Sequence, residues 1–387
     1  MEDRSDLTHS QVIDPRPDWH AFDLPELEGP VSDNITTLAP SIDGLREYGR
    51  TLLEQDGAVY AASFLASSSH KLLGTIMSSG TIADKVSALT LAVRESPLHN
   101  TRAFESLLSL AHKKSRGQAI YALEAIVDLF GPGDVLPASR RLKVFRNQPG
   151  LLGALQRARG RGWKQGDRLP EGITNPHLIF WVFEDWLKTT YFQIIQLLES
   201  WSRDEVGHFR TKALDFVYGL LSEKPEQEAN LLALLVNKLG DKDRRLASRA
   251  SYLLIQIQST HPGMKDVIVQ AIAREVLFRP GQALRARYYA VNTLNQTVLG
   301  RNETSIADML LRVYFDLFSS MLKGGEMSSF TGEELSAEAR PLKKPNRERA
   351  TSAAEEESTS QLAEKLISAI LTGINRAAPY VDGDDDV

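Results

Sequence analysis

The dominant pattern in this sequence is a recurrence of apolar residues every three or four positions from Ser41 to Lys323, the period of an amphipathic α-helix. Sustained alternation of apolar and polar residues, which marks a strand, is nearly absent. Prolines at positions 176, 225, 262 and 280 fall at the boundaries of the periodic stretches, where a missing N–H is harmless. The pattern predicts helices over residues 42–55, 58–78, 80–95, 99–113, 116–130, 139–157, 176–202, 205–223, 226–239, 242–259, 263–278, 282–298 and 303–322.

Several predicted helices share a signature in which a basic residue is followed by an alanine and an apolar run. The alanines are Ala88, Ala119, Ala213, Ala250 and Ala290, with separations of 31 (88 to 119), 37 (213 to 250) and 40 residues (250 to 290). A small alanine lets paired helices approach closely, and the basic residue is expected to bond to the preceding turn. HEAT and armadillo repeats run about 40 to 47 residues. We therefore expect an all-α, HEAT/armadillo-like helical-repeat solenoid over residues 41–323, with a non-repeating helical bundle as the alternative.

The segments outside this region have a different composition. Residues 1–40 are acidic and rich in Pro, Ser and Thr, and we expect them to be disordered. Residues 324–358 are predicted to form a low-complexity mobile insert, because they cannot bury a core. A helix within residues 359–380 is expected to continue the repeat domain, and residues 381–387 form an acidic end.

Composition excludes several classes of protein. The formal net charge is −5, so a nucleic-acid contact would need a local basic patch. The chain has no cysteine, which rules out disulfides, thiol catalysis and Cys-ligated zinc and is compatible with a reducing compartment. The N-terminus has no apolar run of the signal-peptide type, and no apolar stretch is long enough to span a bilayer. We expect no membrane partner.

Enzyme signatures are missing from the sequence. The phosphate-binding loop, the nucleophile elbow and the zinc-protease motif do not occur. The histidines are scattered, and structural roles are expected for His177, His208 and His261. We therefore expect no enzymatic activity, no catalytic or metal site, no cofactor and no small-molecule substrate.

The strongest local feature is a basic segment, residues 140–168, with nine cationic side chains against one acid, Asp167. Guanidinium groups pair with phosphates, and aromatic rings can stack on unpaired bases. The segment predicts an RNA-binding region made of Arg140, Arg141, Lys143, Arg146, Arg157, Arg159, Arg161, Trp163, Lys164 and Arg168. The alternatives are contact with an acidic partner protein and a solvated basic loop.

Other aromatic residues are expected in the core rather than on a surface. The run from Phe180 to Trp186 begins the longest predicted helix, and its two tryptophans do not share one face. The same interpretation applies to Tyr288, Tyr289, Tyr314 and Phe315.

Six stretches of this chain resemble one known family. They are VLPASRRLKVF (135–145), WVFEDWLKTTY (181–191), RTKALDFVYGLLSEKPEQEANLLALLVNKLGD (210–241), THPGMK (260–265), LFRPGQALRARYYAVNTLNQ (277–296) and KLISAILTGINRAAPY (365–380). Their content and order are similar to those of the CCAAT-binding-factor/Mak family of nucleolar-complex (Noc) proteins. The resemblance covers roughly residues 80–380.

The resemblance implies a helical-repeat protein of the nucleus and nucleolus that acts in early assembly of the pre-60S ribosomal particle. It also implies a heterodimer with a second Noc protein and contacts with pre-rRNA and other pre-60S assembly factors. Family chains continue beyond the final matched helix, so we expect this sequence to be an N-terminal portion or a truncated form. Two alternatives remain, namely a CCAAT-box transcription regulator and a transport or adaptor solenoid that binds only proteins.

Overall fold

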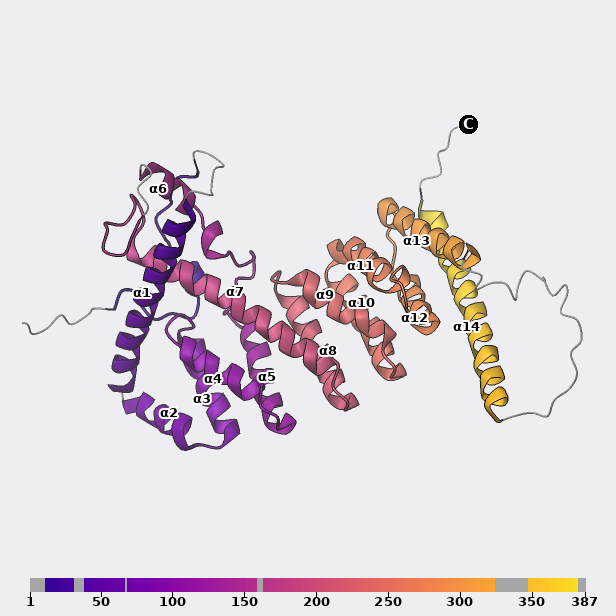
Figure 1. The fold of residues 1–387 in the computed structure, drawn as a ribbon, viewed down its shortest axis with the longest axis horizontal. Coiled ribbons are helices and arrows are strands. Elements are labelled where there is room, and N and C mark those ends of the chain that lie inside the picture. The colour runs from indigo at the N-terminus through magenta and orange to yellow at the C-terminus, as the bar shows by residue number, and fades with distance from the viewer. Residues whose placement is uncertain (1–10, 31–37, 67, 159–162, 324–346, 382–387) are drawn as a thin grey trace, which may run out of the picture. The chain divides into compact units, whose positions relative to one another are not determined.

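The computed structural model describes residues 11–30, 38–66, 68–158, 163–323 and 347–381, and every helix or turn in these ranges belongs to an all-α fold (Figure 1). The prediction of an all-α, helical-repeat fold is confirmed. The α-helices are α1 (Ala39–Ala66), α2 (Ser68–Ser79), α3 (Ile82–Glu95), α4 (Thr101–Ala111), α5 (Arg116–Phe130), α6 (Leu151–Arg157), α7 (Asn175–Ser202), α8 (Gly207–Glu223), α9 (Glu228–Asn237), α10 (Arg244–Thr260), α11 (Lys265–Ile272), α12 (Leu284–Asn295), α13 (Thr304–Lys323) and α14 (Arg347–Ala377). No described helix is long and apolar enough to cross a membrane.

The chain divides into two compact units. Unit 1 comprises Met1–Leu198 and Gly219–Glu228, and unit 2 comprises Glu199–Tyr218 and Ala229–Val387. Helix α8 therefore begins in unit 2 and ends in unit 1.

The core of unit 1 is built from aromatic side chains of α4, α5 and α7. Phe130 stacks on Tyr191 with ring centroids 5.0 Å apart, and Phe104 meets Phe130 edge to face at 5.2 Å. Offset and edge-to-face contacts of this kind add to the free energy of apolar burial. Trp181 and Phe183 are buried, which confirms the core position predicted for the aromatic run.

The N-terminal segment, residues 11–30, differs from the expectation of disorder. Trp19 is 2% exposed, its indole N–H donates to the carbonyl of Val135 at 2.9 Å, and its ring meets Phe183 edge to face. Further along, His177 Nε2 donates to the Pro25 carbonyl at 2.9 Å. Composition alone did not reveal these few anchors, which attach the segment to α7 and to the loop that follows α5. Residues 1–10 and 31–37 lie outside the described residues.

The predicted break between the first two helices, at residues 56 and 57, is wrong. Helix α1 is continuous through Asp56, whose carboxylate is buried and accepts the N–H groups of Val12 at 2.6 Å and Ile13 at 3.3 Å. An aspartate followed by a glycine resembles a helix end in sequence, but here the carboxylate is occupied by the N-terminal segment. The helix therefore continues to Ala66.

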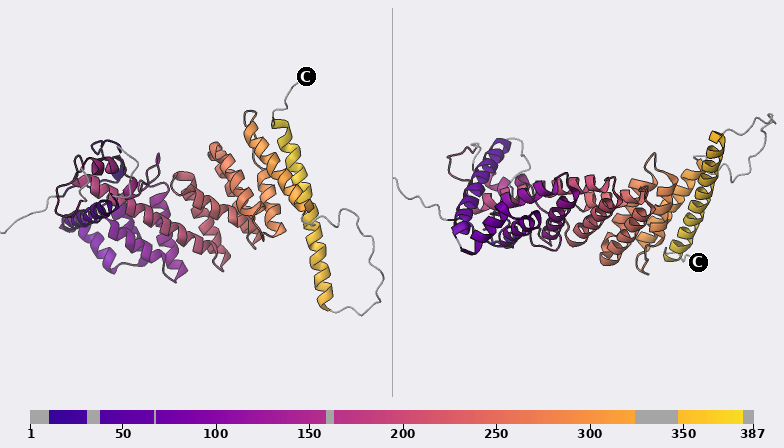
Figure 2. Two further views of the ribbon diagram at one scale, coloured as in Figure 1. Left: turned by 45° about the horizontal axis from the view of Figure 1, so that its top comes forward. Right: turned by 90° about the horizontal axis from the view of Figure 1, so that it is seen from below.

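Unit 2 has the layered arrangement of a helical repeat (Figure 2). Helix α10 packs on α12 and α12 on α14, while α11 packs on α13, so alternate helices stack in two layers. The signature alanines Ala213, Ala250 and Ala290 are fully buried. Ala88 and Ala119 are likewise buried in unit 1. They are therefore core residues, and close helix approach at these alanines and the assignment to the HEAT or armadillo type remain predictions.

The predicted bond between a signature basic residue and the preceding turn is confirmed for Arg210. Its guanidinium donates to the carbonyls of Asp204 at 2.9 Å and Glu205 at 3.1 Å. Arg285, at the start of α12 and outside the signature, donates to the carbonyls of Asp241 and Lys242 in the turn before α10. These contacts join the N-terminus of one helix to a neighbouring turn.

The last helices of unit 2 pack around a glycine. A Cβ at Gly373 of α14 would lie 2.5 Å from Asn295 of α12 and 2.5 Å from the Tyr314 ring of α13. Tyr314 is buried as predicted, whereas the prediction is wrong for Phe315, which is 54% exposed. Tyr288 and Tyr289 are half-buried.

Helix α14 also begins earlier than expected, at Arg347 rather than at 359. Residues 347–358, predicted to belong to a mobile insert, are therefore helical. The rest of that insert, residues 324–346, lies outside the described residues, as do residues 382–387 of the acidic end.

Candidate nucleic-acid interface

The first part of the basic segment, residues 140–148, is an irregular loop held against α7 by buried carboxylates. The backbone N–H of Leu142 donates to Glu226 at 2.6 Å, that of Lys143 to Glu184 at 2.9 Å, and that of Phe145 to Asp185 at 3.1 Å. These donors are unavailable for an α-helical ladder, so the predicted helix over 139–157 is wrong. Only a 3₁₀ turn, Phe145–Asn147, and the short helix α6 form there.

A half-buried lysine completes this attachment. Lys188 of α7 donates to the carbonyl of Leu142 at 2.9 Å and to Glu226 at 2.8 Å. Glu184, which accepts the Lys143 N–H, also accepts from the side chain of Gln148 at 2.9 Å. A buried charge is costly unless it is paired and hydrogen-bonded. These contacts explain how Glu184, Asp185 and Glu226 can all be buried.

Three of the predicted RNA-binding arginines are paired within the protein. Arg140 pairs with Glu184, Arg141 with Glu228 at 2.5 Å, and Arg157 with Glu28 of the N-terminal segment at 3.1 Å. A carboxylate beside each guanidinium cancels part of its attraction for a phosphate. We therefore expect these three residues to contribute less to a polyanion contact than their sequence pattern suggests.

Trp163 lies in the interior, which corrects its assignment as an RNA-stacking residue. It is 7% exposed, its backbone N–H donates to Ser41 Oγ at 3.0 Å, and its ring centroid is 5.7 Å from that of Tyr48. A Cβ at Gly44 would lie 3.3 Å from the indole ring. The ring fastens the loop to α1 and has no open face for a base.

Four predicted cations are partly or fully exposed and form no ion pair with a described residue: Lys143, Arg146, Lys164 and Arg168. Arg159 and Arg161 lie outside the described residues. The predicted patch therefore separates into internally paired arginines and a set of free cations on two loops.

Helix α1 supports both loops and carries a paired cation, Arg46, that the sequence did not indicate. Arg46 is 44% exposed and pairs at 2.7 Å with Asp185, the carboxylate that also holds the N–H of Phe145. Trp163 packs two residues earlier on the same helix, at Gly44. Arg46 is distant from the basic segment in sequence, so no local pattern could have assigned it.

This arrangement can attract a polyanion. Exposed Lys and Arg side chains on fixed loops neutralise phosphates without reading bases, and such contacts carry the salt dependence of nucleic-acid binding. In the described ranges no group of three or more His, Asp or Glu side chains is placed to hold a metal ion.

A nucleophile–base pair that the sequence did not reveal is buried under the N-terminal segment. Ser96 Oγ lies 2.6 Å from His99 Nδ1, and His99 Nε2 lies 3.1 Å from Asp56. All three residues are less than 9% exposed, and the Asp56 carboxylate also holds the backbone of Val12 and Ile13. With no room for a substrate, the three residues act as a structural network that fastens residues 11–13 to α1.

Comparison with known proteins adds an independent line of information. No family model matches the chain. The ribosome biogenesis protein NOC1 of Chaetomium thermophilum is 53% identical over 97% of this chain and 36% of its own length. CCAAT/enhancer-binding protein zeta of Mus musculus is 35% identical over 81% of this chain and 25% of its own length. Nucleolar complex protein 1 of Drosophila melanogaster is 28% identical over 71% of this chain and 23% of its own length.

The chain thus spans about a quarter to a third of the length of these relatives. The similarity extends over both units, because the match with the Chaetomium protein includes 377 residues. The six stretches that resemble the family therefore lie within one long aligned region rather than in isolated segments. This chain belongs to the Noc/CCAAT-binding-factor family.

Proposed function

We propose that this chain is a non-enzymatic scaffold in ribosome biogenesis. The observation that carries the proposal is the 53% identity, over nearly the whole chain, to a protein named for ribosome biogenesis. A second relative is named as a nucleolar complex protein, which supports action in the nucleus and nucleolus. The finer proposal is early assembly of the pre-60S particle in a heterodimer with a second Noc protein, on pre-rRNA and with other assembly factors.

The exposed cations supply the physical basis for contact with pre-rRNA. Lys143, Arg146, Lys164 and Arg168 lie on two loops that α1 and α7 hold in place. Their attraction for phosphate is sequence-independent and falls with salt. A helical-repeat chain of this kind offers long surfaces on which protein and RNA can bind at separate places.

The test is a salt titration of binding between this chain and transcripts of early pre-60S rRNA. The test variant replaces Lys143, Arg146, Lys164 and Arg168 by Ala, and the matched control replaces four exposed cations of unit 2, Lys242, Arg244, Arg245 and Arg301. Each contact contributes about 0.7 to the slope of log K against log salt on single strands, so the test variant should lose up to about 3. The control should keep the slope of the unaltered chain.

Competitors distinguish the alternatives. Random-sequence DNA should compete only weakly with the rRNA transcript. If a CCAAT duplex displaced the transcript and random-sequence DNA did not, a transcription regulator would be favoured. An unchanged slope in the test variant would remove these four cations from the RNA contact. Failure of the chain to bind RNA at moderate salt would leave a protein-only scaffold as the better function.

A further inference from the structure

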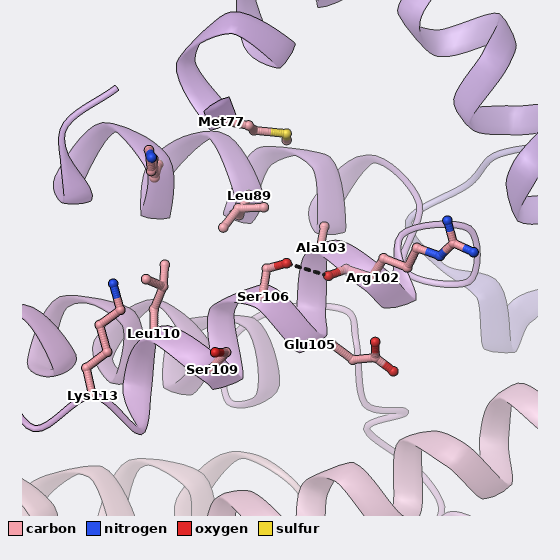
Figure 3. Close-up of a pocket in the computed structure, with 10 residues that line it drawn as sticks. Met77, Leu89, Arg102, Ala103, Glu105, Ser106, Ser109, Leu110 and Lys113 are labelled. Atoms are coloured by element: carbon pink, nitrogen blue, oxygen red, sulfur yellow. Dashed lines mark hydrogen bonds between the residues drawn. The ribbon is translucent and has the colours of Figure 1, made fainter. Parts of the chain in front are cut away.

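An open groove of about 760 Å³ lies between α2, α3 and α4 in unit 1 (Figure 3). Its residues lie outside the basic segment, and they belong neither to the proposed RNA contact nor to the six stretches that resemble the family. Its inner surface is aliphatic and comes from three helices, with Met77 on α2, Leu89 on α3, and Ala103 and Leu110 on α4.

The helices that form this groove leave an apolar stripe in contact with water. In Figure 3, Leu89 points from α3 toward α4, and Leu110 points back toward α3. Leu89 is largely covered, whereas Met77, Ala103 and Leu110 are half-buried. Covering such surface is favourable by about 25 cal/mol per Å², so the stripe favours an apolar occupant.

The charge around the groove has the opposite sign to that of the chain. Its lining includes Lys85, Arg102 and Lys113 against one acid, Glu105, a formal balance of +2 in a protein of net charge −5. Arg102 and Lys113 lie toward opposite ends (Figure 3). Arg102 lies in the first turn of α4 and Lys113 lies just beyond its end at Ala111. The nine-residue step from Arg102 to Ala111 rises about 14 Å, so the two cations are separated by about three turns of a helix.

An aliphatic inner surface with a cation toward each end fits a protein segment better than RNA. Single-stranded RNA is held largely by aromatic rings on which bases stack, whereas the lining of this groove contains no aromatic ring and a single guanidinium, that of Arg102. A partner helix would place an apolar face on the floor and carboxylates near the ends, the pattern of helix-in-groove recognition.

We propose that this groove binds an acidic amphipathic helix of a partner protein. The apolar positions of that helix, spaced three or four residues apart, contact Met77, Leu89 and Leu110. Its acidic side chains, about three turns apart, pair with Arg102 and Lys113. This proposal stands apart from the RNA contact, since it uses different residues and a different class of ligand.

The absence of cysteine from the chain allows a direct test. Ser109, an exposed residue of the groove, is replaced by Cys and labelled with an environment-sensitive fluorophore. The probe is a helical peptide of about 14 residues with Leu on one face and Glu near both ends. The emission of the fluorophore is expected to change and to reach saturation as this peptide is added. A peptide of the same composition with scattered leucines, and one with Lys in place of Glu, should each bind at least about tenfold more weakly.

Charge reversal locates the site. R102E/K113E in the labelled chain changes exposed side chains only and should weaken binding about tenfold or more. K71E/R94E, a matched pair of exposed cations of unit 1 outside the groove lining and outside the RNA-binding loops, should leave binding unchanged. Circular dichroism of each variant checks that the helices are intact. Equal binding of the three peptides, or full binding by R102E/K113E, would overturn the proposal. So would an RNA oligonucleotide that displaces the acidic peptide and requires the same two cations.

Discussion

The backbone N–H of Leu142 donates to the carboxylate of Glu226 at 2.6 Å, although the two residues are 84 positions apart in the chain. This contact joins the basic segment to the turn between α8 and α9. It directs residues 140–148 along the surface of α7 and leaves the side chains of Lys143 and Arg146 available to solvent. The path of the candidate RNA-binding loop is therefore set by an acidic side chain far outside it.

Replacing Glu226 by Ala should destabilise unit 1 by about 3–5 kcal/mol, because it leaves Lys188 and the N–H of Leu142 without their buried partner. Urea unfolding gives the free energy, and amide exchange at residues 142–145 reports the loop. Glu228→Ala is the matched control, since its pair with Arg141 is largely exposed and should contribute less than about 1 kcal/mol. Equal effects of the two variants would contradict the role assigned to Glu226.

Trp19→Ala should release the N-terminal segment and cost about 3–5 kcal/mol, the usual range for truncating a buried tryptophan. Limited proteolysis should then cut within residues 11–30 much faster than in the unaltered chain. Asp14→Ala, at an exposed position of the same segment, is the control. If the unaltered chain is cut there just as fast, the segment is not anchored by Trp19.

Ala250→Leu should destabilise unit 2 by about 1–3 kcal/mol, since the position is fully buried and leucine would overpack it. Ser248→Leu adds a larger apolar side chain at an exposed position of the same helix and should have little effect. The midpoint of chemical unfolding distinguishes the two. A tolerated leucine at position 250 would show that the helices are not in close contact at this alanine.

Glu303 provides a pH-dependent contribution to stability. Its carboxylate accepts from Lys265 Nζ at 2.8 Å and from the Gly300 N–H at 2.7 Å, and these two contacts, the lysine first, lower its pKa below the ordinary 4.5. A lowered folded pKa stabilises the fold above the ordinary value, and that stabilisation is lost as pH falls through the lowered one.

Glu303→Gln should therefore reduce stability near neutral pH and match the unaltered chain in acid. Unfolding midpoints measured from about pH 3 to about pH 7 test this expectation. Asp308→Asn, in the exposed pair with Arg312, is the control and should show a smaller pH dependence. A constant difference between Glu303→Gln and the parent across the whole range would refute the link to ionisation.

The hydrophobic period of the sequence was sufficient to predict most helices, because a 3.6-residue repeat describes a buried face whatever it packs against. It also predicted the burial of Ala250 and Trp181 and located the basic segment. It was wrong at residues 139–157, where apolar spacing resembled a helix but Glu184, Asp185 and Glu226 bind the backbone donors. It was wrong again at residues 11–30, where few apolar anchors in polar sequence suggested disorder.

The sequence alone determined the all-α class, the alanine-based repeat and the family, since these depend on residue type and local spacing. Only the tertiary structure decided which cations of the basic segment are free and which are paired, that Trp163 packs on α1, and that Arg46 lies beside Asp185. The groove lined by Leu89, Arg102 and Leu110 likewise exists only because three helices meet. Ion pairing and burial depend on partners distant in the chain, and no local pattern of residues encodes which partners the fold brings together.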